Sequence, residues 1–336
     1  MFQTKLILNL QSLASDGLTA FMNTVTSLGD DKILAVILLL ILFGISFRKG
    51  ILLFQIFMWV LLITDGLKTI FNLPRPLFVN SNIHNLQHDE TSLSPFTSAG
   101  AETFFGPMDP QVVEEFRRQG SDNFGFPSGH VSSVVALWGG IALLFQKRIL
   151  YWFVPILITL VALSRMYLGR HFLGDVLGGI TVGAAVLAIV YLLVDRWGFE
   201  HKLFKLASLE FAGKLTNVLL YAFLLVVPLI LGILSPDVLG KGAGYLVGAN
   251  TALILIVMRG ELPDEAGSFL KRVVRTSLGF LLYFGAYGIA ELIVETTGLE
   301  AIAFIDVFIK SAIPIFVSIY GTITIGQKLG LEKGTS

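Results

Sequence analysis

Cysteine is absent from the 336 residues, and charged residues account for only 14% of them. The lack of cysteine excludes disulfide frameworks, thiol catalysis and cysteine-ligated metals, and it leaves the redox compartment open. The 24 basic and 24 acidic residues cancel to a formal net charge of zero, which gives no indication of nucleic acid as a partner. Any functional information carried by charge must therefore lie in where the few charged residues are placed.

Hydrophobic residues, in contrast, make up 54% of the chain, and the mean hydropathy is +0.77. Both values lie well outside the range of ordinary soluble domains. A helix needs roughly 20 apolar residues to cross a bilayer. We therefore predict an all-α polytopic membrane bundle with nine spans, near residues 33–47, 51–70, 130–146, 149–167, 176–194, 216–235, 242–258, 276–294 and 301–325.

The predicted spans form two groups. Residues 1–199 hold a core of five to six helices, and residues 200–336 add about four membrane helices of unassigned role. The linker "GFEHKLFKLASLEFAGK" between them can form an amphipathic helix at the inner face. No internal repeat connects the two groups, so repeat symmetry gives no support to a transport function.

The first thirty residues lack the features of a cleavable signal, because Lys5, Asn9, Gln11 and Asp16 interrupt the apolar stretch and no small-residue cleavage pattern follows. Apolar residues instead recur at helical spacing, namely Leu6, Leu10, Leu13, Phe21, Val25 and Leu28. The pattern predicts an amphipathic helix lying at the membrane interface. A helix packed against the other spans fits the same pattern.

The distribution of basic residues predicts the orientation. If the first span ends inside, fourteen of the 24 lysines and arginines lie in cytoplasmic segments. The long polar segment 74–127 then faces outward, and a connection of that length is usually functional or disordered. It contains "MDPQVVEEFRRQG", which predicts a short surface helix with Asp109 and Pro110 at its start and Gly120 at its end.

Three clusters of polar residues fall at the outer ends of hydrophobic spans. They are Lys68 and Arg75 in "KTIFNLPRP", Ser128, Gly129 and His130 in "FGFPSGH", and Ser164, Arg165, His171 and Asp175 in "SRMYLGRHFLGD". Placing a charged group at membrane depth costs free energy, so we expect each of these groups either to have an oppositely charged or hydrogen-bonding partner or to take part in the function. Lys68, Arg75 and Arg165 supply three positive charges suited to phosphate oxygens. Ser128 and Gly129 precede a helix, where free backbone N–H groups favour an anion.

The histidines add a nucleophile and an acid to this anion site. His171 and Asp175 are four residues apart and hence neighbours on one helical face. A carboxylate there can keep one imidazole nitrogen protonated and leave the other as a nucleophile. His130, from a different span, is then available as general acid for the leaving oxygen.

Each of these residues also has a structural interpretation. Lys68, Arg75, Arg165 and Arg170 can be interfacial residues whose charges reach the lipid headgroups, and Ser128 can be a helix cap. A single histidine near a helix end is more often structural than catalytic. The conjunction of three clusters on one predicted side favours catalysis. Arg170 is the exception, because a plain interfacial arginine fits it better than a contact with a second phosphate or a headgroup.

The spacing matches a three-part signature: Lys68, six residues and Arg75-Pro76, then Pro127-Ser128-Gly129-His130, then Ser164-Arg165, five residues, His171, three residues and Asp175. In this the chain resembles the type 2 phosphatidic acid phosphatase superfamily over about residues 1–200. The resemblance implies an integral-membrane lipid phosphate phosphatase that works through a phosphohistidine intermediate and needs no metal or other cofactor. It makes His171 the nucleophile, Asp175 its orienting partner and His130 the acid. It also assigns the phosphate to Lys68, Arg75, Arg165, Ser128 and Gly129. Ser164 belongs to the signature as well, and we expect only an auxiliary role for it.

Two further groups of polar residues are weaker candidates. His84, His88, Asp89 and Glu90 have the residue types of a zinc site, but the segment shows no helical pattern, and we expect a solvated loop. Glu291, Asp306 and Lys310 lie within predicted spans. Asp306 and Lys310 are four apart, which predicts a structural ion pair. The alternative is that all three line a polar path for a lipid headgroup.

The sequence thus predicts a bacterial inner-membrane lipid phosphatase whose site faces the periplasm or cell exterior and whose partners are the bilayer and a lipid phosphate. Undecaprenyl diphosphate is the first candidate substrate, followed by phosphatidylglycerol phosphate and phosphatidate. One alternative is a phosphotransferase that passes the phosphate to another lipid. A second, supported by the four extra spans, is a lipid transporter or scaffold with a subsidiary site. Vanadate-dependent haloperoxidases share the site pattern, but they are soluble proteins.

Overall fold

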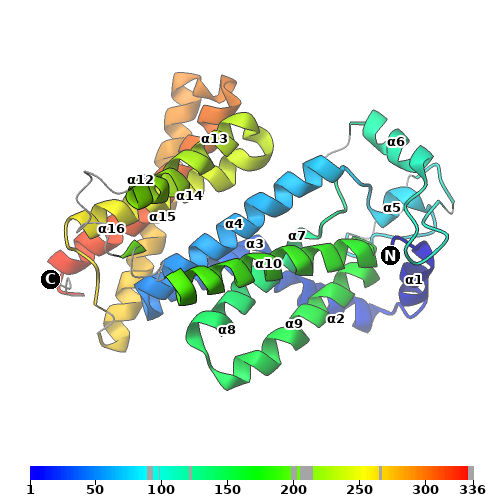
Figure 1. The fold of residues 1–336 in the computed structure, drawn as a ribbon, viewed down its shortest axis with the longest axis horizontal. Coiled ribbons are helices and arrows are strands. Elements are labelled where there is room, and N and C mark those ends of the chain that lie inside the picture. The colour runs from blue at the N-terminus through cyan, green and yellow to red at the C-terminus, as the bar shows by residue number, and fades with distance from the viewer. Residues whose placement is uncertain are drawn as a thin grey trace. The chain divides into compact units, whose positions relative to one another are not determined.

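The regular elements of the chain are helices. The structure, a computed structural model, describes residues 1–88, 94–97, 99–120, 123–197, 203–204, 215–264 and 267–331. Within these ranges β structure is limited to isolated bridges such as that between Pro74 and Phe124. The prediction of an all-α helical bundle is confirmed (Figure 1).

Contacts between residues divide the chain into two compact units. The first comprises Met1–Ala35 and Ile63–Ala188, and the second comprises Val36–Leu62 and Ile189–Ser336. The last boundary falls near the predicted one at residue 200, but residues 36–62 group with the C-terminal helices. A division based on contacts does not identify which residues act together in a function. The division into functional parts 1–199 and 200–336 therefore stays a prediction.

Six helices in the described part of the chain are long and apolar enough to cross a membrane. They are α4 (Phe47–Phe71), α9 (Arg148–Tyr167), α10 (Leu173–Trp197), α14 (Pro236–Met258), α15 (Phe269–Thr297) and α16 (Ala303–Lys328). By this measure the expectation of nine spans is wrong. The predicted spans 130–146 and 216–235 correspond to the shorter apolar helices Gly129–Phe145 and Val218–Leu234.

The remaining predicted span, 33–47, is interrupted before it reaches span length. It consists of α3 (Asp31–Leu39) and the π-helical segment η1 (Leu40–Ile45), and Ser46 is extended before α4 begins. A side chain at Gly50 would place its Cβ 2.4 Å from the Leu42 backbone. The chain therefore forms a hairpin with its turn at Ser46, and a glycine permits the close approach of its two arms.

The N-terminal segment forms two helices, α1 (Thr4–Gln11) and α2 (Asp16–Ser27). Ile7 is fully buried, and the hydroxyls of Thr19 and Tyr167 of α9 are 2.7 Å apart. The segment therefore forms two helices that pack against the rest of the first unit, and a position at the membrane interface stays a prediction. Leu13 and Phe21 remain exposed on the other face.

The long polar segment 74–127, predicted to face outward, carries α5 (Pro76–Val79) and α6 (Pro110–Arg118). The predicted surface helix is confirmed, because Asp109 caps α6 by accepting a hydrogen bond from the Gln111 N–H (2.8 Å) and Gly120 follows with a φ of 62°. The buried side chains beneath the segment form one cluster with α1 and the residue after His171, composed of Ile7, Val79, Ile83, Met108, Val112 and Phe172.

The core of the first unit lies between α2, α7 (Gly129–Val134), α9 and the start of α10. Its buried side chains include Val25, Val131, Val134, Leu157, Val161, Met166 and Val176. The π-helical segment η2 (Val135–Gly139) and α8 (Gly140–Phe145) continue from α7, and a tight turn leads into α9 (Figure 1). Burial of these β-branched and long apolar side chains is the main stabilising term.

Two glycines of α10 set its distance from α7. A Cβ at Gly179 would lie 2.6 Å from the backbone oxygen of Ser128, and one at Gly183 would lie 2.6 Å from Val135. Since the two glycines are four residues apart, they share one helical face. Close packing on that face brings Ser128 against the helix that carries Asp175.

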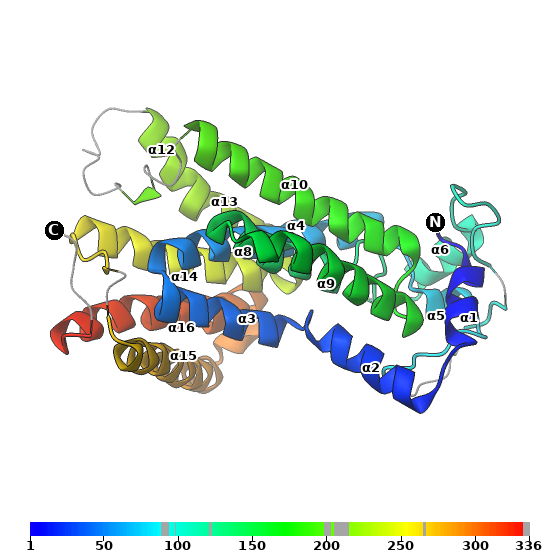
Figure 2. The same cartoon turned by 90° about the horizontal axis from the view of Figure 1, so that it is seen from below.

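The second unit contains α12 (Leu215–Tyr221), the π-helical segment η4 (Ala222–Val226), α13 (Val227–Leu234) and then α14, α15, η5 (Leu299–Ala301) and α16. The last helix packs against both α14 and α15 (Figure 2). Asp306 and Lys310 form the predicted ion pair, with 2.6 Å between Lys310 Nζ and Asp306 Oδ1. Most of the linker predicted as an amphipathic helix lies outside the described residues.

Candidate active site

His171 and Asp175 form a buried pair where α9 gives way to α10. His171 lies two residues before α10, and Asp175 lies in its first turn. Nδ1 of His171 is 3.4 Å from Oδ2 of Asp175, which also accepts a hydrogen bond from the Phe172 N–H at 2.9 Å. The carboxylate therefore faces the imidazole as predicted, although the histidine precedes the helix instead of lying on its face. If Nδ1 carries the proton, Nε2 holds the free lone pair.

Positive charges surround this pair. Burial, followed by the charges of Arg75 and Arg165, holds the pKa of His171 well below its ordinary value. Burial and then the nearby charge of Arg170 lower the pKa of Arg75 to about 10, so this guanidinium stays cationic at neutral pH. The site therefore combines a neutral imidazole with charges that suit an anion.

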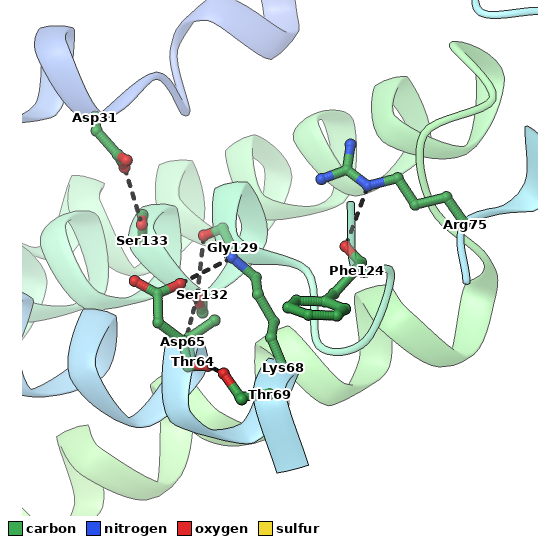
Figure 3. A network of polar contacts seen from close by, with 10 residues as sticks. All are labelled: Asp31, Thr64, Asp65, Lys68, Thr69, Arg75, Phe124, Gly129, Ser132 and Ser133. Carbon is green, nitrogen blue, oxygen red and sulfur yellow. Dashed lines mark hydrogen bonds and ion pairs between the residues drawn. The ribbon is translucent and has the colours of Figure 1, made fainter. Parts of the chain in front are cut away.

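Arg165, which is buried, and Arg75, which is half-buried, keep donor atoms unused. Arg165, in the last turn of α9, donates from Nη1 to Thr26 Oγ1 (2.9 Å) and to Gln87 Oε1 (3.2 Å). Arg75, which precedes α5, donates from Nε to the carbonyl of Phe124 at 3.1 Å (Figure 3). Arg75 Nη1 and Arg165 Nε are buried and have no hydrogen-bond partner among the described residues. Buried donors without acceptors are costly, and an anion bound there would satisfy them.

Lys68, in the last turn of α4, lies over the start of α7. Its Nζ is 2.9 Å from Oδ1 of Asp65, and a Cβ at Gly129 would be 3.1 Å from the same Nζ (Figure 3). Thr64 of α4 donates to Ser132 Oγ (2.9 Å), which in turn donates to the Gly129 carbonyl (2.9 Å). These hydrogen bonds hold the ammonium group beside the glycine that the sequence assigned to phosphate binding.

Ser128 is fully buried and immediately precedes α7. Its N–H donates to the carbonyl oxygen of Asp175 at 2.9 Å, which connects the second and third clusters. Its hydroxyl makes no capping hydrogen bond, and Oγ has no partner in the part of the chain that the structure describes. The interpretation of Ser128 as a side-chain cap is therefore wrong, and the hydroxyl is available to a ligand.

His130, the second residue of α7, faces a residue that the sequence did not single out. Its Nε2 is 3.0 Å from Oδ1 of Asp30, just before α3. The only sequence signal for this partner was the Asp30-Asp31 pair directly before an apolar run. Nothing in the sequence connected that pair with a histidine 100 residues away.

Other supporting residues were also missed. Asp65 was detectable in principle, because it stands three residues before Lys68 on the same helix. Thr26 and Gln87, which hold Arg165, are separated from it by 139 and 78 residues and show no local pattern.

The structure also shows where the weaker candidate residues from the sequence lie. Ser164 is buried and donates to the carbonyl of Val161 (2.7 Å) in its own helix, whereas Arg170 lies close enough to act electrostatically on Arg75 and Arg165. His84 and His88 lie in a non-helical loop, while Asp89 and Glu90 fall outside the described residues. No group of three histidine, aspartate or glutamate side chains suited to a metal occurs in the described ranges.

Residues 48–199 match the model of the PAP2 superfamily, which confirms the resemblance read from the sequence. This segment contains all three clusters of the site but does not reach Asp30. No solved structure matches the chain significantly.

Curated relatives include three phosphatases. Phosphatidylglycerophosphatase B of Bacillus subtilis is 33% identical over 24% of this chain and 41% of its own length. Lipid A 4'-phosphatase of Porphyromonas gingivalis is 35% identical over 20% of this chain and 29% of its own length. Sphingosine-1-phosphate phosphatase 1 of Mus musculus is 28% identical over 52% of this chain and 44% of its own length. The chain thus spans less than half the length of each of these relatives.

Proposed function

We propose, because residues 48–199 belong to the PAP2 superfamily, that this integral membrane protein is a phosphatase that removes the terminal phosphate from a membrane lipid. The observation that carries the proposal is the set of buried polar atoms without partners among the described residues, Arg75 Nη1, Arg165 Nε and Ser128 Oγ, in the site of the His171–Asp175 pair. Two guanidinium donors and a hydroxyl match the oxygens of a phosphate.

The mechanism follows from the roles that the residues can play. His171 Nε2 attacks phosphorus while Asp175 holds the proton on Nδ1, and a phosphorus–nitrogen bond forms as the bond to the leaving oxygen breaks. His130 protonates that oxygen. Water then attacks the phosphohistidine and releases phosphate. Lys68, Arg75 and Arg165 stabilise the charge on the phosphate oxygens, the part that Mg²⁺ plays in many phosphoryl-transfer enzymes, so we propose that no metal is needed.

The names of the three relatives specify phosphatidylglycerophosphate, lipid A and sphingosine 1-phosphate, all of them lipids with a terminal phosphate. They favour a lipid phosphate of this kind for the present chain. Undecaprenyl diphosphate and phosphatidate stay in the candidate set, since the donor groups of the site suit phosphate oxygens, which all of these lipids carry. A phosphate-release panel in detergent over these five lipids would identify the preferred class. We further propose an inner-membrane location with the site outside.

Replacement of the nucleophile tests the proposal directly. We expect purified His171→Ala to lose phosphate release from every lipid of the panel, with a loss of about a millionfold in kcat, as for other covalent nucleophiles. Acid-quenched wild-type protein should carry phosphate on histidine, and the variant should not. Substantial activity in His171→Ala would refute the nucleophile, and loss of wild-type activity in a chelator would refute metal independence.

A phosphotransferase would follow the same mechanism as far as the phosphohistidine intermediate and would then transfer the phosphate to a second lipid instead of to water. Phosphate appearing on a second lipid, with no free phosphate released, would establish that alternative.

A further inference from the structure

The carboxylate of Asp30 contacts His130, the second histidine of the candidate site. Oδ1 of Asp30 is 3.0 Å from Nε2 of His130, and both side chains are partly exposed. The first carboxylate, Asp175, faces His171. Each of the two histidines of the site therefore has its own aspartate.

The turn that carries Asp30 docks closely on α7. The next residue, Asp31, accepts a hydrogen bond from the Ser133 hydroxyl at 3.4 Å (Figure 3). Ser133 lies three residues after His130 and hence on the same helical face. A Cβ at Gly29 would lie 3.2 Å from Val134 Cγ2 and 3.4 Å from the His130 carbonyl oxygen. Residues 29–31 thus contact three residues of α7 and hold Asp30 in place.

The charged groups around His130 explain how the contact with Asp30 can affect the protonation of the imidazole. Burial and then the charges of four cations lower the pKa of its imidazole to about 3, and these cations are Arg165, Arg75, Lys68 and Arg170. The neighbouring His171 is neutral at neutral pH. His130 therefore gains a proton only where negative charge offsets burial and these cations, and both a carboxylate in hydrogen-bond contact and a substrate phosphate supply such charge. Asp30 is that carboxylate, and its charge also reaches Arg165.

We propose that Asp30 is a positioning residue that, together with the phosphate of the bound substrate, favours the protonated form of His130 and directs Nδ1 to the leaving oxygen. The inference rests on the proposed phosphatase function. As His171 attacks, the bond from phosphorus to the leaving oxygen breaks and that oxygen takes the proton from His130 Nδ1. The neutral imidazole then accepts a proton from the water that attacks the phosphohistidine, which restores the acid. Asp30 stays a carboxylate throughout.

The test compares two leaving groups in the full-length protein in detergent. Phosphatidate leaves as an alkoxide that needs a proton, whereas p-nitrophenyl phosphate leaves as a stabilised phenolate that does not. Since general acid catalysis contributes about 10²–10⁴-fold, we expect Asp30→Asn to lower kcat for phosphatidate by about 10–100-fold and to change p-nitrophenyl phosphate by less than about threefold. The alkaline limb of the phosphatidate pH profile should move to lower pH, and Asp30→Glu should restore part of the rate.

Asp31→Asn is the matched control, because it removes the neighbouring carboxylate and leaves the contact with His130. It should change neither the ratio between the two substrates nor the pH profile. Gly29→Val, which pushes the turn away from α7, is a second variant and should reproduce the selective loss.

An equal loss on both substrates, or no loss, would overturn the role of Asp30. Failure of the phosphatase function itself would look different, since wild-type protein would then release no phosphate or His171→Ala would retain the activity.

Discussion

The buried imidazole of His171 makes the stability of the protein depend on pH. Its pKa lies well below the ordinary value in the folded state because of burial and the charges of Arg75 and Arg165. Below about pH 6.5 the unfolded chain binds a proton that the folded chain does not, so the free energy of unfolding falls as the pH falls. Above that pH both states are neutral and His171 contributes no pH dependence.

We therefore expect the thermal midpoint of wild-type protein in detergent to fall relative to that of His171→Gln between about pH 6.5 and 5. One proton corresponds to a slope of at most about 1.4 kcal/mol per pH unit. Because groups that do not contact His171 titrate alike in both proteins, the difference between the two curves reports on His171 together with Asp175, which it contacts. Parallel curves over this range would show that the imidazole is not held neutral.

At the scale of elements, the face of α10 decides where Ser128 lies. A side chain at Gly179 would collide with the Ser128 carbonyl, and overpacking of this kind costs about 1–3 kcal/mol. We expect Gly179→Val to lower both the thermal midpoint and the phosphatase activity. Gly285→Val in α15 is the matched control, since a Cβ there meets no atom within 4 Å. Similar behaviour of the two variants would argue against close packing at Gly179.

The ion pair on α16 permits a second prediction at this scale. An unpaired charge within a membrane helix costs about 2.5–3.5 kcal/mol at the helix centre and less near its end. We expect Asp306→Leu to lower the thermal midpoint, because it leaves Lys310 unpaired, and the double replacement with Lys310→Leu to restore most of it. If the double variant is as unstable as the single one and has also lost lipid-phosphatase activity, a role in a headgroup path gains support over the structural pair.

The helices that were predicted least well share one feature. The three segments that fall short of span length contain the π-helical stretches η1, η2 and η4. An apolar run in the sequence reports hydrophobicity, but it does not report where the backbone hydrogen bonding changes or where a helix ends. Packing against neighbouring helices decides that, as it does at Gly50, where one arm of the hairpin meets the other.

At the scale of the whole molecule, the absence of cysteine makes the predicted orientation easy to test. Gln111 on α6 and Lys147 in the turn before α9 are both exposed and lie on opposite sides in the predicted topology. We expect a membrane-impermeant maleimide to label Gln111→Cys in intact spheroplasts and to label Lys147→Cys only after permeabilisation. The reverse pattern would place the site on the cytoplasmic side.

The sequence by itself determined the all-α membrane class, the resemblance to the PAP2 superfamily, the surface helix at 110–118 and the residue types of the candidate site. These depend on hydropathy, capping residues and spacing along the chain, which are local properties. The tertiary structure alone decided that Ser128 is not a side-chain cap, that the N-terminal helices pack against α9, and that Asp30, Thr26 and Gln87 contact the site. Such contacts join residues 78 to 139 positions apart. They form because helices with buried apolar faces pack together, and no pattern within one segment specifies which polar residue its neighbour will meet.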